Sequence, residues 1–378
     1  MTSIAIVGVG ETRYAKRLGR EVGSLALEAA EAAAADAGLA TSAIDGIVAP
    51  SLDYAGLHEL ARNLGIDGAF FAAESLHGGA GVVSAPLIAQ LAIDAGLATA
   101  VLAIEAIAWG SERAGNVGSP HAAMRMKASF EIPFGWYPQI VHFAGMARRH
   151  MELYGTTEDQ LAAVAMACRT HAALCDNAIL RAPLSLDEYR NSQFIADPFR
   201  AADCCLVNDG AAAFIMTTLE RARDAASPLV RVLGVGQGVL RGGEFSTLRP
   251  EYLSTAAIHS GPRAFGQAGV RHADVDFVQI YDNFTGMVIE QLEDLGFCGR
   301  GEGGPFVDGG RIALNGALPV NTAGGQLAQA YVMSGNLMVE AVRQLRGACG
   351  ARQVADARIG LVTGYTGAEH ATVILGAQ

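Results

Sequence analysis

The sequence is poor in charged residues, and basic residues are the scarcer kind. Only 17% of its 378 residues are charged, and the formal net charge is −11. No cluster of lysine and arginine offsets this acidity, so a nucleic-acid-binding protein is disfavoured. Because 51% of the residues are hydrophobic, we expect part of the surface to be buried against a partner. The length allows one large domain or two similar halves.

Cysteine pairs with the spacing of metal ligands are also absent. The six cysteines form no C-x-x-C pair, which argues against a metal site or a disulfide framework and favours a reducing cytoplasm. The strand-like start "SIAIVGVG" is followed by Glu11, unlike a signal peptide. The apolar run 95–104 lies between Asp94 and Glu105 and is too short to span a bilayer. We therefore expect a cytoplasmic protein without a membrane span.

An internal repeat organises the chain. Segments 4–14, "IAIVGVGETRY", and 230–240, "VRVLGVGQGVL", are both β-branched strands that run into Gly-Val-Gly. Each is followed by an alanine-rich helical stretch that ends in Ala-Gly. An aspartate then follows that glycine by seven residues, at Asp45 and Asp276. Each half later contains a Gly-Gly turn that enters an apolar helix, and four features in the same order indicate a duplication.

Strands alternate with helices of ten or more residues, which predicts βαβ units and a mainly parallel sheet. Two such halves packed together would make an α/β protein with five layers, α/β/α/β/α. We place the halves at residues 1–225 and 226–378, with an inserted loop region at about 111–200 that is rich in aromatic and polar residues. The "GVGETR" turn lacks the third glycine and the acidic partner of a dinucleotide-binding fingerprint, so we interpret it as a strand end.

These motifs make the chain resemble the thiolase superfamily over nearly its whole length. Segments 203–216, "DCCLVNDGAAAFIM", and 321–335, "NTAGGQLAQAYVMSG", have counterparts in that family. Segment 296–310, "GFCGRGEGGPFVDGG", is similar to the sterol-carrier-protein-x type and the allied lipid-transfer-type members. The resemblance implies the thiolase fold and a homodimer in which the sheets of two units run together.

The residues that carry thiolase chemistry are nevertheless missing. In "LHGGAG", Gly78 stands where such a thiolase has its nucleophilic cysteine, at a helix N-terminus that would stabilise a thiolate. Tyr281 in "YDNF" and Tyr331 in "AYV" stand where the family has histidines, and the late turn "VTGYTGAEH" contains no cysteine. A Claisen condensation through an acyl-enzyme is therefore not expected.

The pattern resembles instead the thiolase-like aldolases of steroid side-chain degradation, which cleave a β-hydroxyacyl-CoA by a retro-aldol reaction. That resemblance implies that Tyr281 and Tyr331 form an acid–base pair, with CoA as part of the substrate and no separate cofactor or metal. It also implies a small partner subunit that combines an OB-fold with a zinc ribbon and helps to bind the acyl-CoA. Such a partner would account for the absence of a basic cluster for the CoA phosphates.

The chemistry makes sense from the residues alone. A retro-aldol cleavage needs a base for the β-hydroxyl, an oxyanion site for the thioester enolate and an acid that protonates the α-carbon. No covalent intermediate is required. A phenol has a reference pKa of about 10, so a tyrosine could serve as the base if a neighbouring donor or a second phenol lowered that pKa.

Glycine-rich turns are candidates for the oxyanion site. The backbone N–H groups at Gly78 and Gly79, and those of the turn from Gly364 to Gly367, could bind the thioester oxygen. Outside this fold, such turns usually mark tight packing. The missing side chain at Gly78 would also open space for a branched or ring-bearing β-carbon.

Three polar residues complete the candidate site. His77 could hydrogen-bond the substrate or cap its turn. Asn321 could orient a tyrosine or a water. His370 could support one of the tyrosines from behind or could be a structural histidine.

Two other functions stay open. One is a Claisen-type acyl-CoA acyltransferase that uses an unconventional cysteine, and the other is a non-catalytic subunit that binds acyl-CoA or lipid. Cys298 lies in a glycine-rich loop, and Cys204 and Cys205 precede a strand with a buried pattern, so we interpret each as a small core residue. The sequence leaves the acyl chain open between a steroid nucleus and an aromatic or terpenoid group.

Overall fold

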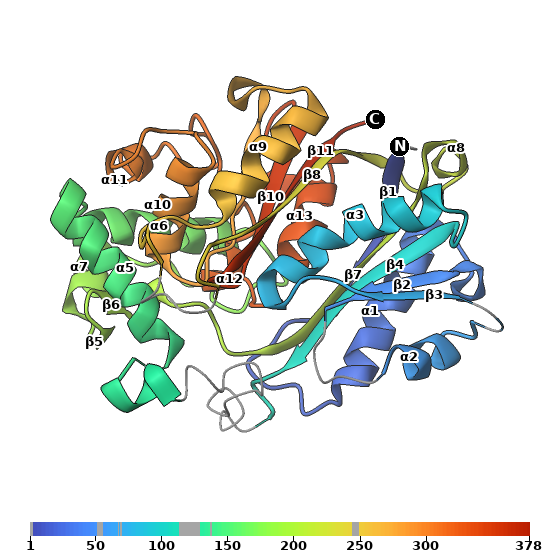
Figure 1. Ribbon diagram of the computed structural model, residues 1–378, viewed down its shortest axis with the longest axis horizontal. Coiled ribbons are helices and arrows are strands. Elements are labelled where there is room, and N and C mark those ends of the chain that lie inside the picture. The colour runs from blue at the N-terminus through green and yellow to red at the C-terminus, as the bar shows by residue number, and fades with distance from the viewer. Residues whose placement is uncertain are drawn as a thin grey trace.

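The computed structural model describes residues 3–50, 56–66, 68, 70–112, 129–136, 138–243 and 249–378. The strands of the main sheet in these residues lie in the order β3-β2-β4-β7-β1-β8-β11-β10-β9 (Figure 1). The two halves of the repeat meet at β1 (Ile4–Glu11) and β8 (Val230–Val239), which pair over two residues. The two halves of the sheet are therefore joined edge to edge.

The sheet is mixed. The other strands of the N-terminal half are β2 (Gly46–Ala49), β3 (Phe71–Glu74), β4 (Ala100–Ala108) and β7 (Asp209–Thr218), and those of the C-terminal half are β9 (Phe277–Gln279), β10 (Ile359–Tyr365) and β11 (Glu369–Gly376). Five of the eight described pairings in this sheet are antiparallel. The prediction of a mainly parallel sheet was wrong, because β7 returns antiparallel to both of its neighbours and β10 and β11 form a hairpin.

Helices cover both faces of the sheet and fill the space between its halves (Figure 1). Helix α1 (Val22–Ala37) packs on β1, β4 and β7, and α9 (Ala257–Ala268) packs on β8 and β11. Helices α3 (Gly81–Asp94) and α13 (Gly335–Leu345) lie between the halves, because each contacts strands of both. Helix α3 is apolar on nearly every side, and ten of its fourteen residues are buried. The five layers of the predicted α/β thiolase fold are confirmed.

The repeated Gly-Val-Gly has a packing role in both halves. A Cβ atom at Gly8 would lie 2.7 Å from the Ala37 side chain of α1, and one at Gly10 would lie 2.9 Å from the backbone of the same helix. In β8, a Cβ atom at Gly234 or Gly236 would lie 2.9 Å or 2.8 Å from the backbone of α9. Contacts of that length are too short for real Cβ atoms, so these glycines permit close approach of helix to strand.

The segment that we expected to be an inserted loop region is largely helical in its described residues, so that expectation was wrong. It contains α5 (Gln139–Tyr154), α6 (Glu158–Ala173), α7 (Leu186–Asn191) and the short strands β5 (Phe194–Ala196) and β6 (Phe199–Arg200). Capping boxes begin α6 at Thr157 and α7 at Ser185, and both could have been found in the sequence. Residues 113–128 of this segment lie outside the described residues.

The remaining helices are short or connect the larger elements. They are α2 (Leu57–Asn63), α8 (Leu219–Ala222), α10 (Thr285–Asp294), α11 (Gly303–Val307) and α12 (Gly325–Ala328). The boundary that we predicted near residue 225 falls between α8 and β8. Within the described residues, no helix has the length and apolar character needed to cross a membrane. In the same residues, no group of three or more metal-ligating side chains is arranged to hold a metal ion.

Candidate active site

Two tyrosines from distant parts of the chain meet in the C-terminal half. Tyr281 lies two residues beyond the end of β9, and Tyr331 lies in the turn between α12 and α13. Their hydroxyl oxygens are 2.6 Å apart, and their rings pack edge to face with centroids 6.2 Å apart. Both side chains are buried, with 3% and 7% of their surface exposed. The structure thus brings together the two phenols singled out in the sequence.

The environment of the pair favours neutral phenols. Burial raises the pKa of both tyrosines above the usual value. The hydrogen bond between them raises the pKa of Tyr281 further and lowers that of Tyr331. The second phenol therefore lowers the pKa of Tyr331, but burial raises that pKa by more. A proton must leave the pair when a substrate binds if one of the phenols is to act as a base.

Hydrogen bonds fix the backbone on either side of the Tyr281 ring. Its N–H donates to Thr363 Oγ1, and its carbonyl accepts from Gln291 Nε2, both at 2.8 Å. The Thr363 hydroxyl donates to Gln291 Oε1 at 2.8 Å. Asn321 clamps the preceding residue, Ile280, by accepting from its N–H at 2.7 Å and donating to its carbonyl at 2.9 Å. Both ends of the Asn321 amide are engaged there, so this side chain orients the Tyr281 turn.

A second amide clamp holds Tyr331. Asn208 Oδ1 accepts from the Tyr331 N–H at 2.7 Å, and Asn208 Nδ2 donates to the Tyr331 carbonyl at 3.2 Å. The Trp109 ring packs on the Tyr331 ring with centroids 5.3 Å apart. Our sequence reasoning missed Asn208. Its signal was its place in the family motif, just before the buried strand β7.

Asp282 ties the two tyrosine-bearing turns to each other. Its carboxylate accepts from the backbone N–H groups of Gln326 at 2.8 Å and Leu327 at 3.3 Å, at the start of α12. Burial raises the pKa of this carboxyl to about 7. Since Tyr331 follows α12 by three residues and Tyr281 adjoins Asp282, this contact helps to set the distance between the phenols.

The glycine turn lies directly against the Tyr281 ring. A Cβ atom at Gly79 would lie 2.5 Å from Tyr281 Cζ, and one at Gly364 would lie 2.9 Å from Ala80 Cα. These two glycines allow the turn, the ring and β10 to approach one another. Gly78 differs, because it has φ +46° and a Cβ atom there would have its nearest neighbours at 3.5 Å and 3.7 Å. A Cβ atom therefore fits at Gly78 without a clash, and this is the position where the resemblance places the missing cysteine.

Comparisons with known proteins identify the family of the chain. Residues 243–377 match the family described as thiolase C-terminal domain-like. Over 99% of its length, the chain is 35% identical to the steroid side-chain-cleaving aldolase of Thermomonospora curvata, of which it covers 98%. The chain belongs to the thiolase superfamily, in its thiolase-like aldolase branch.

Two further comparisons place the chain in the same branch. It is 36% identical, over 98% of its length, to the 17-hydroxy-3-oxo-4-pregnene-20-carboxyl-CoA lyase of Mycobacterium tuberculosis, of which it covers 98%. The solved structure of the Ltp2-ChsH2(DUF35) aldolase superposes with a TM-score of 0.93 at 36% identity, covering 100% of this chain and 98% of that chain. The resemblance inferred from the motifs is confirmed.

Two residues predicted for the substrate site have no recorded bond to the tyrosine pair in this thiolase-like aldolase. His77 is exposed, and its backbone N–H donates to Glu369 Oε2 at 3.1 Å. The Gly367 carbonyl accepts from the Tyr365 hydroxyl at 3.1 Å and from the Arg249 guanidinium. In the described structure, these hydrogen bonds hold the turns of His77 and Gly367 in place.

His370 supports Tyr281 indirectly. Its Nε2 lies 3.1 Å from Gln291 Oε1, and its Nδ1 lies 2.7 Å from Ser260 Oγ. Gln291 in turn holds the Tyr281 carbonyl. Burial lowers the pKa of the imidazole from 6.5 to about 3, so the ring is neutral at physiological pH. Of the two roles considered for His370, the structure supports the one behind the tyrosine.

This histidine makes a testable contribution to acid stability. Between pH 6.5 and about 3 the unfolded chain binds a proton on His370 that the folded chain does not. The folded state should therefore lose about 1.4 kcal/mol per pH unit from this group as the pH falls. Urea unfolding at pH 6 and 5 should show a slope flatter by about that amount in His370→Gln. An equal slope in both proteins would show that His370 titrates normally in the fold.

A buried acid lies near the pair without a partner. Glu105 is fully buried in β4, and neither carboxyl oxygen has a hydrogen-bond partner among the described residues. Burial raises the pKa of this carboxyl well above its usual value, which favours its neutral form. A charge on Glu105 would raise the pKa of Tyr331. We had interpreted Glu105 as the polar end of an apolar run, but an acid within such a run is itself a signal of a buried polar site.

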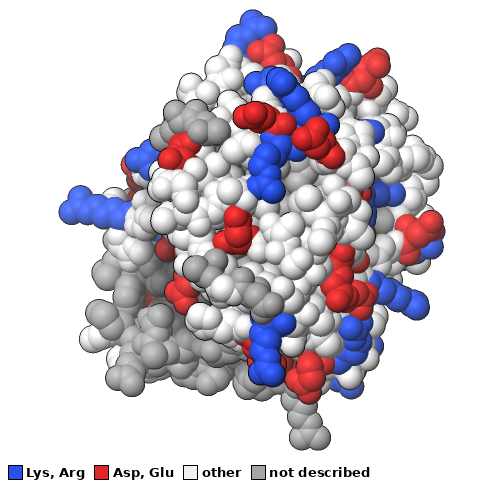
Figure 2. Space-filling model, turned by 90° about the vertical axis from the view of Figure 1, so that its right-hand side faces the viewer, with Lys and Arg blue, Asp and Glu red and all other residues white. Residues whose placement is uncertain are grey.

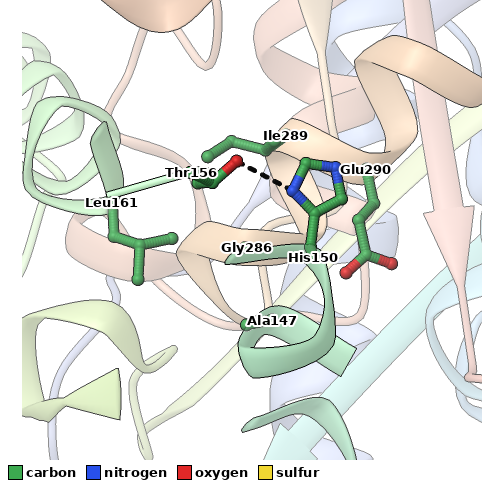
Figure 3. A pocket seen from close by; sticks show the side chains of 7 residues that line it. All are labelled: Ala147, His150, Thr156, Leu161, Gly286, Ile289 and Glu290. Carbon is green, nitrogen blue, oxygen red and sulfur yellow. Dashed lines mark hydrogen bonds between the residues drawn. The ribbon is translucent and has the colours of Figure 1, made fainter. Parts of the chain in front are cut away.

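A small cavity is lined by residues of α5, α6 and α10 and of the turn between α5 and α6 (Figure 3). Its lining residues are Ala147, His150, Thr156, Leu161, Gly286, Ile289 and Glu290. The His150 ring already bonds Thr156 Oγ1 at 2.8 Å and Glu293 Oε1 at 3.0 Å. None of the lining residues is among those predicted for the site, and we interpret the cavity as a gap in the packing of α5, α6 and α10.

Proposed function

We propose that this chain is a carbon–carbon lyase that cleaves a β-hydroxyacyl-CoA by a retro-aldol reaction, with Tyr281 and Tyr331 as its acid–base pair. The observation that carries the proposal is the 2.6 Å contact between the two hydroxyl oxygens in a buried site. The relatives named as an aldolase and a CoA lyase, which match over nearly the whole chain, support the reaction class.

The reaction conserves protons within the pair. After one proton has left the pair, a phenolate takes the proton of the β-hydroxyl. The oxygen electrons form a carbonyl, the Cα–Cβ bond breaks, and its electrons pass into the thioester enolate. The hydroxyl of the other tyrosine then protonates the α-carbon, and a proton transfer along the 2.6 Å contact restores the starting state. The products are a ketone or aldehyde and a shortened acyl-CoA.

The glycine turn provides the oxyanion site in this proposal. Gly78 and Gly79 directly precede α3, which begins at Gly81, and a helix N-terminus favours negative charge. Among the described residues, the structure records no acceptor for the N–H groups of Gly78 and Gly79. These two donors would bind the enolate oxygen of the thioester. Gly364 shapes the turn by letting β10 approach it.

The substrate in this proposal carries a steroid side chain, by analogy with the relative named for a pregnene carboxyl-CoA. The chain would work in the cytoplasm, where its six free cysteines stay reduced. CoA enters as part of the substrate, and no separate cofactor is needed.

The same proposal includes a homodimer and a small acyl-CoA-binding partner with an OB-fold and a zinc ribbon. Strand β3 is an edge of the sheet, with β2 as its only described neighbour, so a second copy could extend the sheet there. Figure 2, which views the molecule from the side of β3, shows small groups of charged residues of both signs with uncharged areas between them. The solved aldolase whose name includes a second component supports the partner. Gel filtration after coexpression with such a subunit tests the assembly, and a fully active single chain would refute it.

The direct test of the lyase is a product assay. The protein, alone and with the partner subunit, is incubated with a panel of β-hydroxyacyl-CoA thioesters and the products are identified by mass spectrometry. We expect a ketone or aldehyde and a shortened acyl-CoA in equal amounts, with no acylated protein. A condensation product, or a thioester on any cysteine, would favour the acyltransferase. Binding without any turnover would favour a non-catalytic subunit.

Iodoacetamide gives that assay a second arm. Burial raises the pKa of all six thiols, and for Cys204 and Cys298 the raised value is about 12. Only the thiolate is a good nucleophile, so these cysteines should react slowly with iodoacetamide at neutral pH. Lyase activity should therefore survive treatment that inactivates a thiolase with a reactive cysteine. Inactivation in step with alkylation of one cysteine would contradict the mechanism.

A further inference from the structure

The turn that follows Tyr331 has an unusual backbone. Met333 and Ser334 have φ angles of +47° and +72°, in the left-handed region that residues with side chains rarely adopt. The Ser334 hydroxyl fixes the turn, because it lies 2.9 Å from the Gly79 carbonyl oxygen and 3.2 Å from the Thr363 carbonyl oxygen. Because the strained turn is fixed by contacts to two other segments, we infer that the orientation of its side chains matters for the site.

This turn aims the Met333 thioether at the tyrosine pair. Met333 Sδ lies 3.3 Å from the Tyr331 hydroxyl oxygen, and 3.7 Å from the place where a Cβ atom at Gly78 would be. The sulfur therefore lies within contact distance of both the Tyr331 hydroxyl and the Gly78 turn. Met333 is buried, with 6% of its surface exposed.

The sulfur determines the direction of the hydrogen bonds. A thioether can accept a hydrogen bond but has no proton to donate. The Tyr331 hydroxyl is therefore the donor to Met333 Sδ, and its only proton is used in that bond. In the 2.6 Å contact between the phenols, the Tyr281 hydroxyl must then be the donor and the Tyr331 oxygen the acceptor.

We propose that Met333 fixes the proton order of the pair, so that Tyr331 is the base that takes the β-hydroxyl proton and Tyr281 is the acid that protonates the α-carbon. This inference rests on the proposed lyase function. Met333 is a positioning residue in it, because it acts through Tyr331.

The proton order depends on which of the two phenolate oxygens would still accept a hydrogen bond from the other tyrosine. If Tyr331 loses its proton, its oxygen still accepts the Tyr281 hydroxyl, and a short charge-assisted bond stabilises the anion. If Tyr281 lost its proton instead, the Tyr331 hydroxyl would have to give up its bond to the sulfur in order to donate to the Tyr281 oxygen. The direction of the pKa effects agrees, since the mutual hydrogen bond lowers the pKa of Tyr331 and raises that of Tyr281.

The test replaces the acceptor at constant volume. Met333→Leu removes the sulfur and keeps a side chain of similar size. The Tyr331 proton should then turn to the Tyr281 oxygen, which reverses the bond and makes Tyr331 the poorer base. At pH 7, kcat should fall about tenfold with little change in KM, and the rising limb of the kcat profile should move about one unit to higher pH. A wild-type pH profile and kcat in this variant would overturn the inference.

Two matched variants separate proton order from packing. Met333→Gln provides an amide oxygen as a new acceptor, so it should restore the wild-type pH profile even if Met333→Leu folds poorly. A profile shifted as far in Met333→Gln as in Met333→Leu would contradict the role of the acceptor. Met338→Leu makes the same exchange at a fully buried methionine of α13 and should leave the profile unchanged. A shift as large there would also overturn the proposal.

A second measurement does not depend on activity. Neutron diffraction from deuterated crystals should show the Tyr281 deuteron on the line between the two oxygens and the Tyr331 deuteron directed at Met333 Sδ. The opposite arrangement would overturn the proton order even in an active lyase. If the deuterons lie as expected but no β-hydroxyacyl-CoA is cleaved, the proposed function fails while the hydrogen-bond direction stands.

Discussion

Tyr331→Phe is expected to lower the rate of carbon–carbon cleavage about 10³-fold while the protein stays folded. The phenylalanine ring keeps the contact with Trp109 but removes the hydroxyl that meets Tyr281 at 2.6 Å. The Tyr281 hydroxyl then loses its acceptor, which should cost about 1–2 kcal/mol of stability. Initial rates at saturating substrate and a thermal melt check both expectations. Turnover within a few-fold of wild type would exclude the phenol pair as the acid and base.

The double variant tests whether the two phenols act as one unit. Tyr281→Phe should also cause a loss of about 10³-fold, and residues of one catalytic unit show non-additive losses. The double variant should therefore be about as slow as either single variant. Losses that multiply would show two independent contributions and would contradict proton transfer along the contact.

Tyr189→Phe is a matched control for the loss of a buried hydroxyl. Tyr189 is fully buried, and its hydroxyl lies 3.0 Å and 2.8 Å from the two Asp203 carboxyl oxygens. It shares no recorded hydrogen bond with the tyrosine pair among the described residues. We expect a lower melting temperature with unchanged turnover, which is the reverse of the pattern for Tyr331→Phe.

The site was predictable where motifs and the duplication coincide. Tyr281 and Tyr331 lie in motifs with clear family counterparts, and the glycine at position 78 argued against the usual cysteine chemistry of the family. The residues that hold the two tyrosines were not predictable. Asn208 binds the backbone of Tyr331 from 123 residues away, and Gln291 hydrogen-bonds both the Tyr281 carbonyl and His370. An asparagine before a strand has the pattern of a turn former, and only the tertiary fold shows that it clamps a backbone.

The fold was predictable in its layers and not in its strand directions. Repeated Gly-Val-Gly segments and apolar helices such as α3 identify two packed halves. Alternation of strands and helices does not reveal that β7 enters between β1 and β4 in the antiparallel sense. The composition of the inserted segment favoured a loop, whereas Thr157 and Ser185 each begin a capping box. Local capping signals were more reliable there than composition.

Gly79→Ala is expected to remove most of the activity because the new methyl group would displace the Tyr281 ring. The new Cβ atom would lie 2.5 Å from Tyr281 Cζ and 2.6 Å from the Tyr365 carbonyl oxygen, both closer than real Cβ atoms approach. The Gly79 turn cannot move away from the ring easily, because β10 already packs closely against this turn at Gly364. The Tyr281 ring must therefore move. A displacement of about 1 Å at a reacting group can cost about 10²-fold in rate.

Two glycine variants distinguish this displacement from a general effect of added volume. Gly78→Ala places its Cβ atom at ordinary contact distances of 3.5 Å and 3.7 Å, so Tyr281 should stay in place despite the positive φ. Gly266→Ala, on the exposed side of α9 with nothing within 4 Å, should stabilise the helix by about 0.5–1 kcal/mol.

Measured well below the melting temperature of each variant, kcat should fall about 10²-fold for Gly79→Ala and stay unchanged for Gly266→Ala. Gly78→Ala should act mainly on KM, because its methyl group would lie beside the proposed oxyanion site and leave the phenol contact intact. Wild-type kcat in a folded Gly79→Ala protein would mean that the ring can shift without consequence. The 2.6 Å contact would then be a packing feature, and the acid–base pair would have to be sought elsewhere.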